Sequence, residues 1–175
     1  MNILIAYYSR RGQNYVGGDI VDLKVGNTEV AAGMIRKLTG GETFQIETVK
    51  TYPAEYQATT EVSQQELRQN ARPELASQVT RMSAFDVIIL GYPNWWGTMP
   101  MAVFSFLEAY DFTGKTILPF CTHEGSGLGR SVGDIKKLCQ GAKVSRGLAI
   151  VGGNVRQAEA EISAWLKAAG IPDPA

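Results

Sequence analysis

An uninterrupted apolar run begins almost at the N-terminus, at 3–8, and a second, longer run, in which Asp86 is the one charged residue, occupies 85–92. Short runs of this kind, rich in β-branched and aromatic residues, are typical of strands that are buried on both faces. A strand that is buried on both faces needs helices above and below its sheet. The two runs therefore favour an α/β fold built on a parallel sheet.

The rest of the chain alternates between strand and helix patterns. Further strands are expected at 43–47, on the edge of the sheet, at 115–121 and at 142–150, where Gly147 marks a bulge or kink. Apolar residues at helical spacing predict helices at 27–39, 73–82, 100–107, 131–138 and 154–169, with a weaker helical pattern at 55–70. This alternation predicts a parallel sheet covered on both faces, in one domain over 1–170 with a tail at 171–175.

Bulk properties exclude several function classes. The 175 residues carry 17 basic and 17 acidic side chains, with no basic patch, which argues against a nucleic-acid partner. No apolar run is long enough to span a membrane, and no signal-peptide pattern occurs, so a cytoplasmic protein is expected. Cys121 and Cys139 match no metal-ligand spacing, and no metal site is predicted. Two free thiols are the simplest interpretation, and a disulfide or a reactive thiol is the alternative.

The first strand and the first helix frame a candidate anion site. The strand ends at Ser9, the helix begins at Asn27-Thr28, and seventeen residues separate Ser9 from Asn27. Within this insertion, Gly17-Gly18 favours a short hairpin. Backbone N–H groups in a first helical turn are unsatisfied and lie at the positive end of the helix dipole. Ser9 and 26–28 are therefore interpreted as two halves of one anion site; the alternative is an ordinary connection in which Asn27 merely caps the helix.

Two other loops follow strands and should reach the same edge of the sheet, where open sheets of this type bind ligands. The loop at 93–98 offers two adjacent indoles, and the loop at 122–129 offers polar side chains among three glycines. A phosphate pocket, a flat π-surface and a rim of donors suit flavin mononucleotide (FMN). Alternatives stay open. Trp95 and Trp96 are equally consistent with packing or with a homodimer contact. His123 is equally consistent with a structural hydrogen bond. Arg10 is either solvated or directed at the phosphate.

The chain resembles the flavodoxin-like proteins, in a form with an insertion after the first strand. The resemblance rests on residues 8–10, 26–31, 91–100 and 120–127. It implies a three-layer sandwich with a five-stranded parallel sheet of order 2-1-3-4-5 and non-covalent FMN. The residues implied at the cofactor are Ser9, Arg10, Asn27 and Thr28 for the phosphate, Pro93, Asn94, Trp95, Trp96 and Gly97 for the isoalloxazine ring, and Thr122, His123, Glu124, Gly125 and Gly127 for its pyrimidine edge. The interrupted phosphate loop, and a third loop that lacks tyrosine, depart from the pattern.

Three function classes remain open at this stage. They are an FMN enzyme that takes hydride from NAD(P)H and reduces a quinone or similar small acceptor, a one-electron carrier for redox protein partners, and a scaffold without flavin. A small carrier gains from an acidic face that steers its partners, and this chain has no net charge. We therefore favour the enzyme, with His123 or Glu124 as the candidate catalytic proton donor.

Overall fold

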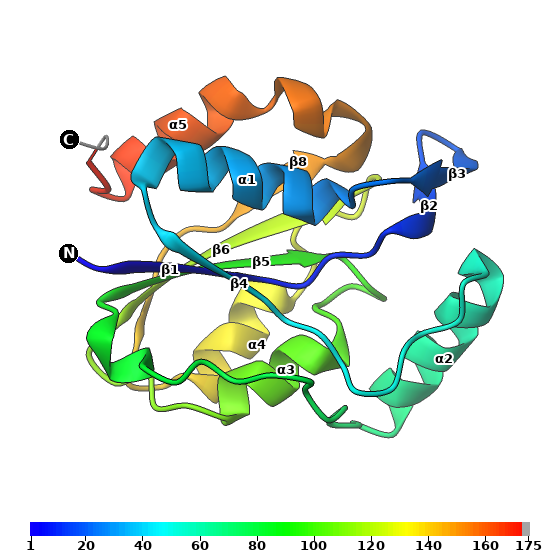
Figure 1. The fold of residues 1–175 in the computed structure, drawn as a ribbon, viewed down its shortest axis with the longest axis horizontal. Coiled ribbons are helices and arrows are strands. Elements are labelled where there is room, and N and C mark those ends of the chain that lie inside the picture. Colours follow the sequence, from blue (N-terminus) through cyan, green and yellow to red (C-terminus); the bar gives the residue numbers. More distant parts are fainter. Residues whose placement is uncertain (173–175) are drawn as a thin grey trace.

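A computed structural model describes residues 1–172, so most of the expected tail lies outside the described residues. The chain forms a parallel sheet between two layers of helices (Figure 1). The strands run in the order β4-β1-β5-β6-β7, with β8 also paired to β6. They are β1 (Ile3–Tyr7), β4 (Glu42–Gln45), β5 (Val87–Pro93), β6 (Thr116–His123), β7 (Lys143–Val144) and β8 (Leu148–Val151).

The fifth position of the sheet is filled by two short segments. β7 pairs with the start of β6, where Thr116 faces Lys143, and β8 pairs with its end, where Phe120 faces Leu148. The break between them includes Gly147, where an added Cβ would meet Leu128 and Val132 at 3.0–3.1 Å. The predicted kink is thus present, and the predicted order 2-1-3-4-5 is confirmed, with β7 and β8 sharing the fifth position.

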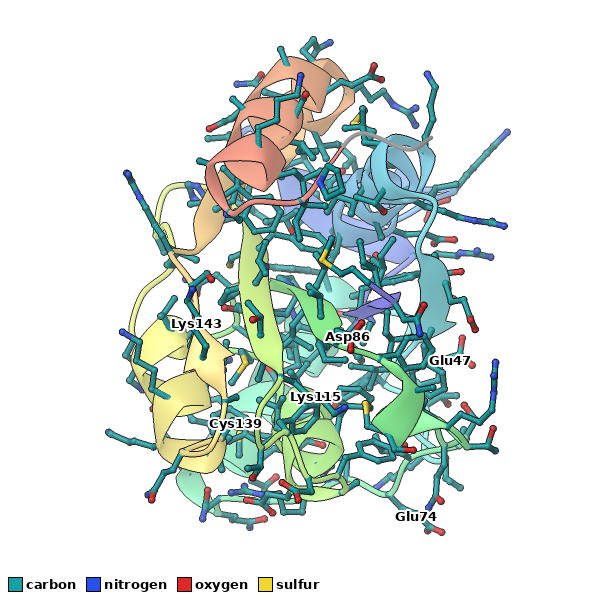
Figure 2. The ribbon with its side chains drawn as sticks, turned by 90° about the vertical axis from the view of Figure 1, so that its left-hand side faces the viewer. Glu47, Glu74, Asp86, Lys115, Cys139 and Lys143 are labelled. Atoms are coloured by element: carbon teal, nitrogen blue, oxygen red, sulfur yellow. The ribbon has the colours of Figure 1, made fainter. Side chains whose placement is uncertain are left out.

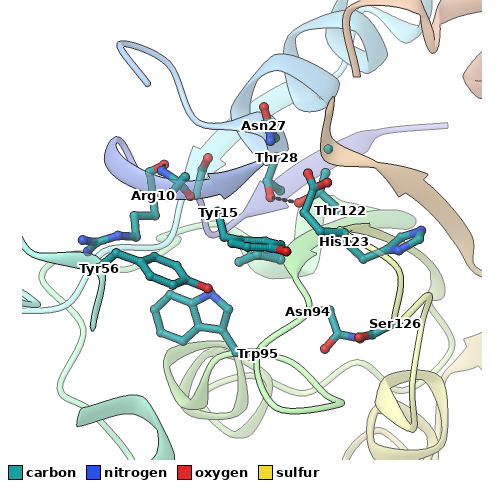
Figure 3. Close-up of a pocket in the computed structure, with 15 residues that line it drawn as sticks. Arg10, Tyr15, Asn27, Thr28, Tyr56, Asn94, Trp95, Thr122, His123 and Ser126 are labelled. Carbon is teal, nitrogen blue, oxygen red and sulfur yellow. Dashed lines mark hydrogen bonds between the residues drawn. The ribbon is translucent and has the colours of Figure 1, made fainter. Parts of the chain in front are cut away.

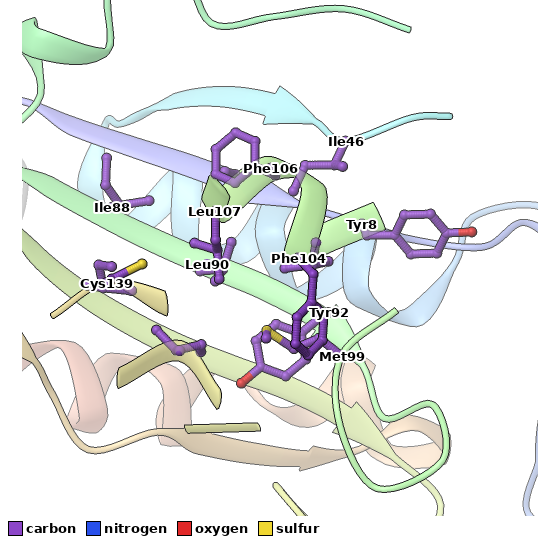
Figure 4. Close-up of a cluster of buried hydrophobic side chains, with 14 of the residues drawn as sticks. Tyr8, Ile46, Ile88, Leu90, Tyr92, Met99, Phe104, Phe106, Leu107 and Cys139 are labelled. Atoms are coloured by element: carbon purple, nitrogen blue, oxygen red, sulfur yellow. The ribbon is translucent and has the colours of Figure 1, made fainter. Parts of the chain in front are cut away.

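Alternate side chains of the strands fill two separate cores. Ile3 and Ile5 face α1 (Asn27–Thr39) and α5 (Glu159–Ala168), whereas Leu4 and Ala6 face α3 (Met101–Glu108) and α4 (Ser131–Leu138). Figure 4 shows the second core, in which the buried side chains of β5 lie beneath those of α3. Because the central strands β1, β5 and β6 bury both of their faces, the middle of the sheet is a rigid platform, and chemistry is left to the strand ends.

The two ends of the sheet differ in character. Figure 2 views the molecule from the amino ends of the strands, where Asp86, Lys115 and Lys143 lie. Lys115 donates to the carbonyl of Phe85 at 2.6 Å, and Asp86 accepts from the N–H of Asn2 at 2.7 Å. At the amino end, charged side chains thus bond to backbone groups of the protein. The cavity lies at the opposite, carboxyl end of the sheet.

The insertion folds as the predicted hairpin. Its strands, β2 (Gly12–Val16) and β3 (Asp19–Leu23), are antiparallel, with Tyr15 directly opposite Ile20. Gly17 and Gly18 turn the chain with positive φ angles of 61° and 97°, the combination that a two-residue hairpin favours. The hairpin lies at the carboxyl end of the sheet, on the same side as α2 (Tyr56–Arg68), the weakly predicted helix (Figure 1).

Two helix predictions need correction. No α-helix forms at 73–82; the segment pairs with 47–49, and the backbone N–H of Ala76 donates to the carbonyl of Glu47. Only the short 3₁₀ turn η1 (Met82–Ala84) follows it. The predicted helix at 154–169 begins instead as the 3₁₀ segment η2 (Gly152–Gln157), ahead of α5.

Ile171, which belongs to the expected tail, is buried at 4% exposure. Within residues 1–172, none of the helices is long and apolar enough to cross a membrane.

Candidate functional site

A cavity of about 260 Å³ opens at the carboxyl ends of β1, β5 and β6 (Figure 3). It is bounded by the three loops that the sequence singled out and by the hairpin. Its lining residues are Ser9, Arg10, Asn14, Tyr15, Asn27, Thr28, Tyr56, Pro93, Asn94, Trp95, Thr122, His123, Glu124, Ser126 and Gly152. Segments far apart in the sequence therefore meet in one place, as the parallel topology predicts.

Ser9 and the start of α1 are in contact across the insertion. The Oγ atom of Ser9 accepts a hydrogen bond from the backbone N–H of Glu29 at 3.1 Å. Gly26, the N-cap residue, lies so close to Ser9 and Arg10 that an added Cβ would collide with both. Ser9 therefore bonds to the first turn of the helix as a capping side chain. The alternative interpretation had assigned that role to Asn27. The sequence was right that these segments converge.

The first helical turn leaves backbone donors available. Within residues 1–172, no protein acceptor meets the N–H groups of Asn27 and Thr28. The hydroxyl of Thr28 is already engaged, because its Oγ1 lies 2.7 Å from Oγ1 of Thr122. Thr28 is 2% exposed and Thr122 5% exposed, so each is the other's hydroxyl partner in a buried position. The free N–H groups at the positive end of α1 make this part of the cavity suited to an anion.

Both arginines that follow β1 are already paired with other groups of the protein, Arg10 in a half-buried position and Arg11 at the exposed surface. Arg10 lines the cavity, but its guanidinium donates to the carbonyls of Gln13, Pro53 and Ala54 at 2.9–3.0 Å. Burial lowers the pKa of Arg10 from its ordinary value. Arg11 forms an ion pair of 2.7 Å with Glu29, whose hydrogen bond raises the pKa of Arg11. Arg10 is therefore a clamp on neighbouring backbone rather than a free cation.

The second loop turns sharply between Trp95 and Thr98, whose backbones exchange hydrogen bonds of 2.9 and 3.2 Å. Trp96 and Gly97 at the turn have φ angles of 57° and 85°. A left-handed conformation suits glycine but costs a bulky residue such as tryptophan about 1–3 kcal/mol. Asn94 holds the turn, since its Oδ1 accepts from the N–H of Gly97 and its Nδ2 donates to the carbonyl of Gly127.

The adjacent indoles diverge, as expected for neighbouring residues. Trp95 lines the cavity and packs edge-on against Tyr8 and Tyr52, with ring centroids 5.2 and 5.3 Å away. Trp96 is 45% exposed and donates from Nε1 to Oγ of Ser63 on α2, beside an adjoining cavity of about 210 Å³. The structure thus distinguishes the two, which the sequence could not, and places Trp95 in the main cavity.

The third loop contributes His123 and Glu124. Nδ1 of His123 accepts from the N–H of Gly125 at 2.9 Å, and Figure 3 shows the imidazole directed away from Trp95. Glu124 accepts from the N–H of Gly17, at the hairpin turn, through Oε2 at 3.2 Å. Its Oε1 is buried and has no hydrogen-bond partner among the described residues. Glu124 therefore ties the hairpin to the third loop and leaves one acceptor unsatisfied.

Four predicted site residues do not line the main cavity: Trp96, Gly97, Gly125 and Gly127. Gly97, Gly125 and Gly127 instead supply the backbone groups that fix Asn94 and His123, as described above. Sequence reasoning missed Asn14, Tyr15, Tyr56 and Gly152, and it included Ser126 only as part of the polar third loop. For Tyr15 a signal existed, because it is an aromatic residue close to the hairpin glycines of the insertion.

A family model described as Flavodoxin matches residues 23–169. No curated protein matches the sequence. Among solved structures, a Bacteroides eggerthii protein assigned as a flavoprotein is 27% identical, with a TM-score of 0.79, over 98% of this chain and 99% of that one.

Two more distant structures share the fold. A Lactobacillus acidophilus flavoprotein in complex with FMN is 19% identical over 89% of this chain and 97% of that one, with a TM-score of 0.65. An NADH:FMN oxidoreductase is 13% identical over 96% of this chain and 90% of that one, with a TM-score of 0.54.

Proposed function

This chain belongs to the flavodoxin family, and from that premise we propose that it binds FMN non-covalently and acts as an NAD(P)H-dependent oxidoreductase that reduces a quinone or similar small acceptor. The observation that carries the proposal is the cavity at the carboxyl ends of the strands, which combines free helical N–H groups with an aromatic wall. When bound, FMN supplies hydride acceptance and electron transfer. The remaining steps belong to the residues of this chain.

The start of α1 fits a terminal phosphate. The N–H groups of Asn27 and Thr28 are free among the described residues, and the hydroxyl hydrogen of Ser9 is free to donate, since its Oγ only accepts from Glu29. Gly26 lacks the side chain that would fill this corner. The helix dipole adds a favourable field for a negative group. Donors and space therefore agree with a phosphate monoester.

The other side of the cavity fits a flat ring system. Trp95 presents an indole that is fixed by Tyr8 and Tyr52, and Asn94 and Thr122 supply polar groups at the strand ends. Aromatic faces and a few placed polar groups are what a planar heteroaromatic ligand requires. The FMN complex of the Lactobacillus acidophilus relative supports the same assignment.

His123 is the residue that we propose to move a proton. Because its Nδ1 accepts from Gly125, the ring proton of the neutral imidazole lies on Nε2. To give a proton to an acceptor oxygen, His123 would act as the imidazolium: the ring turns toward the cavity, Nδ1 releases the Gly125 N–H and takes up a proton from water, and Nε2 gives its proton to the oxygen, which leaves a neutral imidazole. The NADH:FMN oxidoreductase of the same fold supports a reductase, and so does the balanced charge of this chain.

Two measurements test the proposal. The bound chromophore is extracted from purified protein and identified by chromatography; recovery of FAD, or no uptake of FMN on reconstitution, would overturn the cofactor assignment. The FMN form is then mixed with NADH or NADPH in a stopped-flow instrument, and a quinone is added. Reduction too slow to support turnover, together with fast electron exchange with a redox protein, would make the protein a carrier.

A further inference from the structure

The inserted hairpin is hydrogen-bonded to two segments beside the cavity, the start of α2 and the third loop. At its base, Arg10 donates to the carbonyls of Pro53 and Ala54 ahead of α2. In its first strand, Oε1 of Gln13 accepts from the N–H of Tyr56 at 2.8 Å, at the start of α2. At its tip, Gly17 donates to Glu124 of the third loop. Contacts at the base, middle and tip hold the hairpin over the cavity in a defined position.

This position brings two tyrosines together from separate elements. Tyr15 of β2 and Tyr56 of α2 are stacked, with ring centroids 6.4 Å apart and an angle of 27° between the rings. Both line the cavity that Trp95 lines. Figure 3 shows the three labelled rings gathered on one side, with His123 and Ser126 on the other. The cavity thus has an aromatic side that combines Tyr15 of the inserted hairpin, Trp95 of the second loop and Tyr56 of α2.

Tyr15 keeps a large part of its side chain open to solvent. It is 44% exposed, although its ring already rests against Tyr56. An aromatic ring that is held from behind and open in front is preorganised for stacking, because little side-chain freedom remains to be lost on binding. Tyrosine also provides a large contact area at a low conformational cost.

We propose that the hairpin is part of the cofactor site, and that Tyr15, supported by Tyr56, stacks on the isoalloxazine ring. The inference rests on the proposed binding of FMN and adds a residue that recognises the ring rather than the phosphate. Tyr15 therefore contributes equally to the binding of FMN and of riboflavin, which share the ring and differ in the phosphate.

The test compares both ligands in three variants. Stacking of one aromatic side chain on a base changes affinity by roughly fivefold to a hundredfold. Tyr15→Ala should weaken FMN and riboflavin by the same factor in this range and raise the fluorescence of the bound flavin. Tyr15→Phe keeps the ring and should bind both ligands as the unaltered protein does. Ile20→Ala is the matched control, since Ile20 faces Tyr15 across the hairpin, is 50% exposed and does not line the cavity.

The outcomes separate this inference from the proposed function. Unaltered protein that takes up no flavin overturns the proposed function, and this inference with it. Unaltered protein that binds FMN, with Tyr15→Ala binding equally well, overturns the inference alone. Equal losses in Tyr15→Ala and Ile20→Ala assign the effect to hairpin stability and also overturn it. A loss confined to FMN places Tyr15 at the phosphate and does the same.

Discussion

The buried hydroxyl pair of Thr28 and Thr122 joins the start of α1 to the end of β6, and it allows a quantitative prediction. The two Oγ1 atoms are 2.7 Å apart, and both residues are almost fully buried. Replacing either threonine by valine keeps the shape and leaves the other hydroxyl without a partner. Such an orphaned polar group costs about 1–3 kcal/mol of unfolding free energy.

The double variant Thr28→Val/Thr122→Val should be close to neutral, because both polar partners are then replaced by apolar groups of the same shape. The two single costs should therefore not add, and the coupling between the positions should equal the sum of the two single costs, about 2–6 kcal/mol. Urea unfolding of the four proteins without added flavin measures this coupling. Additive costs, with the double variant as damaged as the sum of the singles, would refute the reasoning.

The same variants separate two roles of Thr28 at the cofactor. Thr122→Val leaves the Thr28 hydroxyl free to reach a phosphate, whereas Thr28→Val removes it. If that hydroxyl binds phosphate, Thr28→Val weakens FMN by roughly tenfold to a hundredfold, riboflavin changes far less, and Thr122→Val has no such effect. Equal changes for both ligands in both variants would show that the pair supports only the fold.

Three further predictions follow from single contacts. Glu124→Gln keeps an oxygen that accepts from the hairpin and removes the negative charge of a carboxylate whose other oxygen is buried without a partner. Because a phosphate is repelled by that charge and riboflavin is not, titration should show FMN binding about threefold to tenfold tighter and riboflavin binding unchanged. A weaker FMN complex would contradict this. Gly26→Ala should lower the free energy of unfolding, measured in urea, by about 1–3 kcal/mol, because the added Cβ has no room. Gly33→Ala has open space inside α1 and should raise the free energy of unfolding by about 0.5–1 kcal/mol. Similar effects at both positions would contradict the packing argument. Burial raises the pKa of Cys121 to about 12 and that of Cys139 to about 11, from 9.0, so both should resist alkylation in the native state. The unfolding free energy should fall as pH rises above 9, because the unfolded thiols ionise first; constant stability up to pH 11 would contradict this.

The sequence predicted the elements whose own residues determine them. The apolar runs at 3–8 and 85–92 became central strands because no other environment hides so many consecutive apolar side chains. The helix at 131–138 was predicted at its observed bounds, α4 (Ser131–Leu138). The meeting of Ser9 with the start of α1, across seventeen intervening residues, was predicted by interpreting the strand end and the first helical turn as two halves of one anion site.

The sequence failed where contacts from distant residues decide the outcome. Leu75 and Val79 have helical spacing, but the backbone of this segment bonds to 47–49 instead, and local periodicity carries no information about that partner. Which indole enters the cavity depends on the left-handed φ at Trp96, a conformation that residue statistics disfavour for tryptophan. Tyr15 meets Tyr56 only because Arg10 and Gln13 bind the start of α2.

The arrangement of charge in the cavity implies that different residues set the affinity for the flavin ring and for the phosphate. Arg10 is the one Lys or Arg among the described lining residues, and its guanidinium is occupied by three carbonyls. A phosphate would therefore meet neutral N–H donors at the start of α1, whose dipole acts only within the first turn. The hairpin contributes the neutral amide of Asn14 and the ring of Tyr15 to the cavity, and the ring carbon is indifferent to that charge. Substitutions at Tyr15 should consequently change the affinities for FMN and riboflavin together, whereas substitutions at Thr28 or Glu124 should change their ratio. A ratio that moved with Tyr15 would show that the hairpin and the helix act on the same part of the ligand.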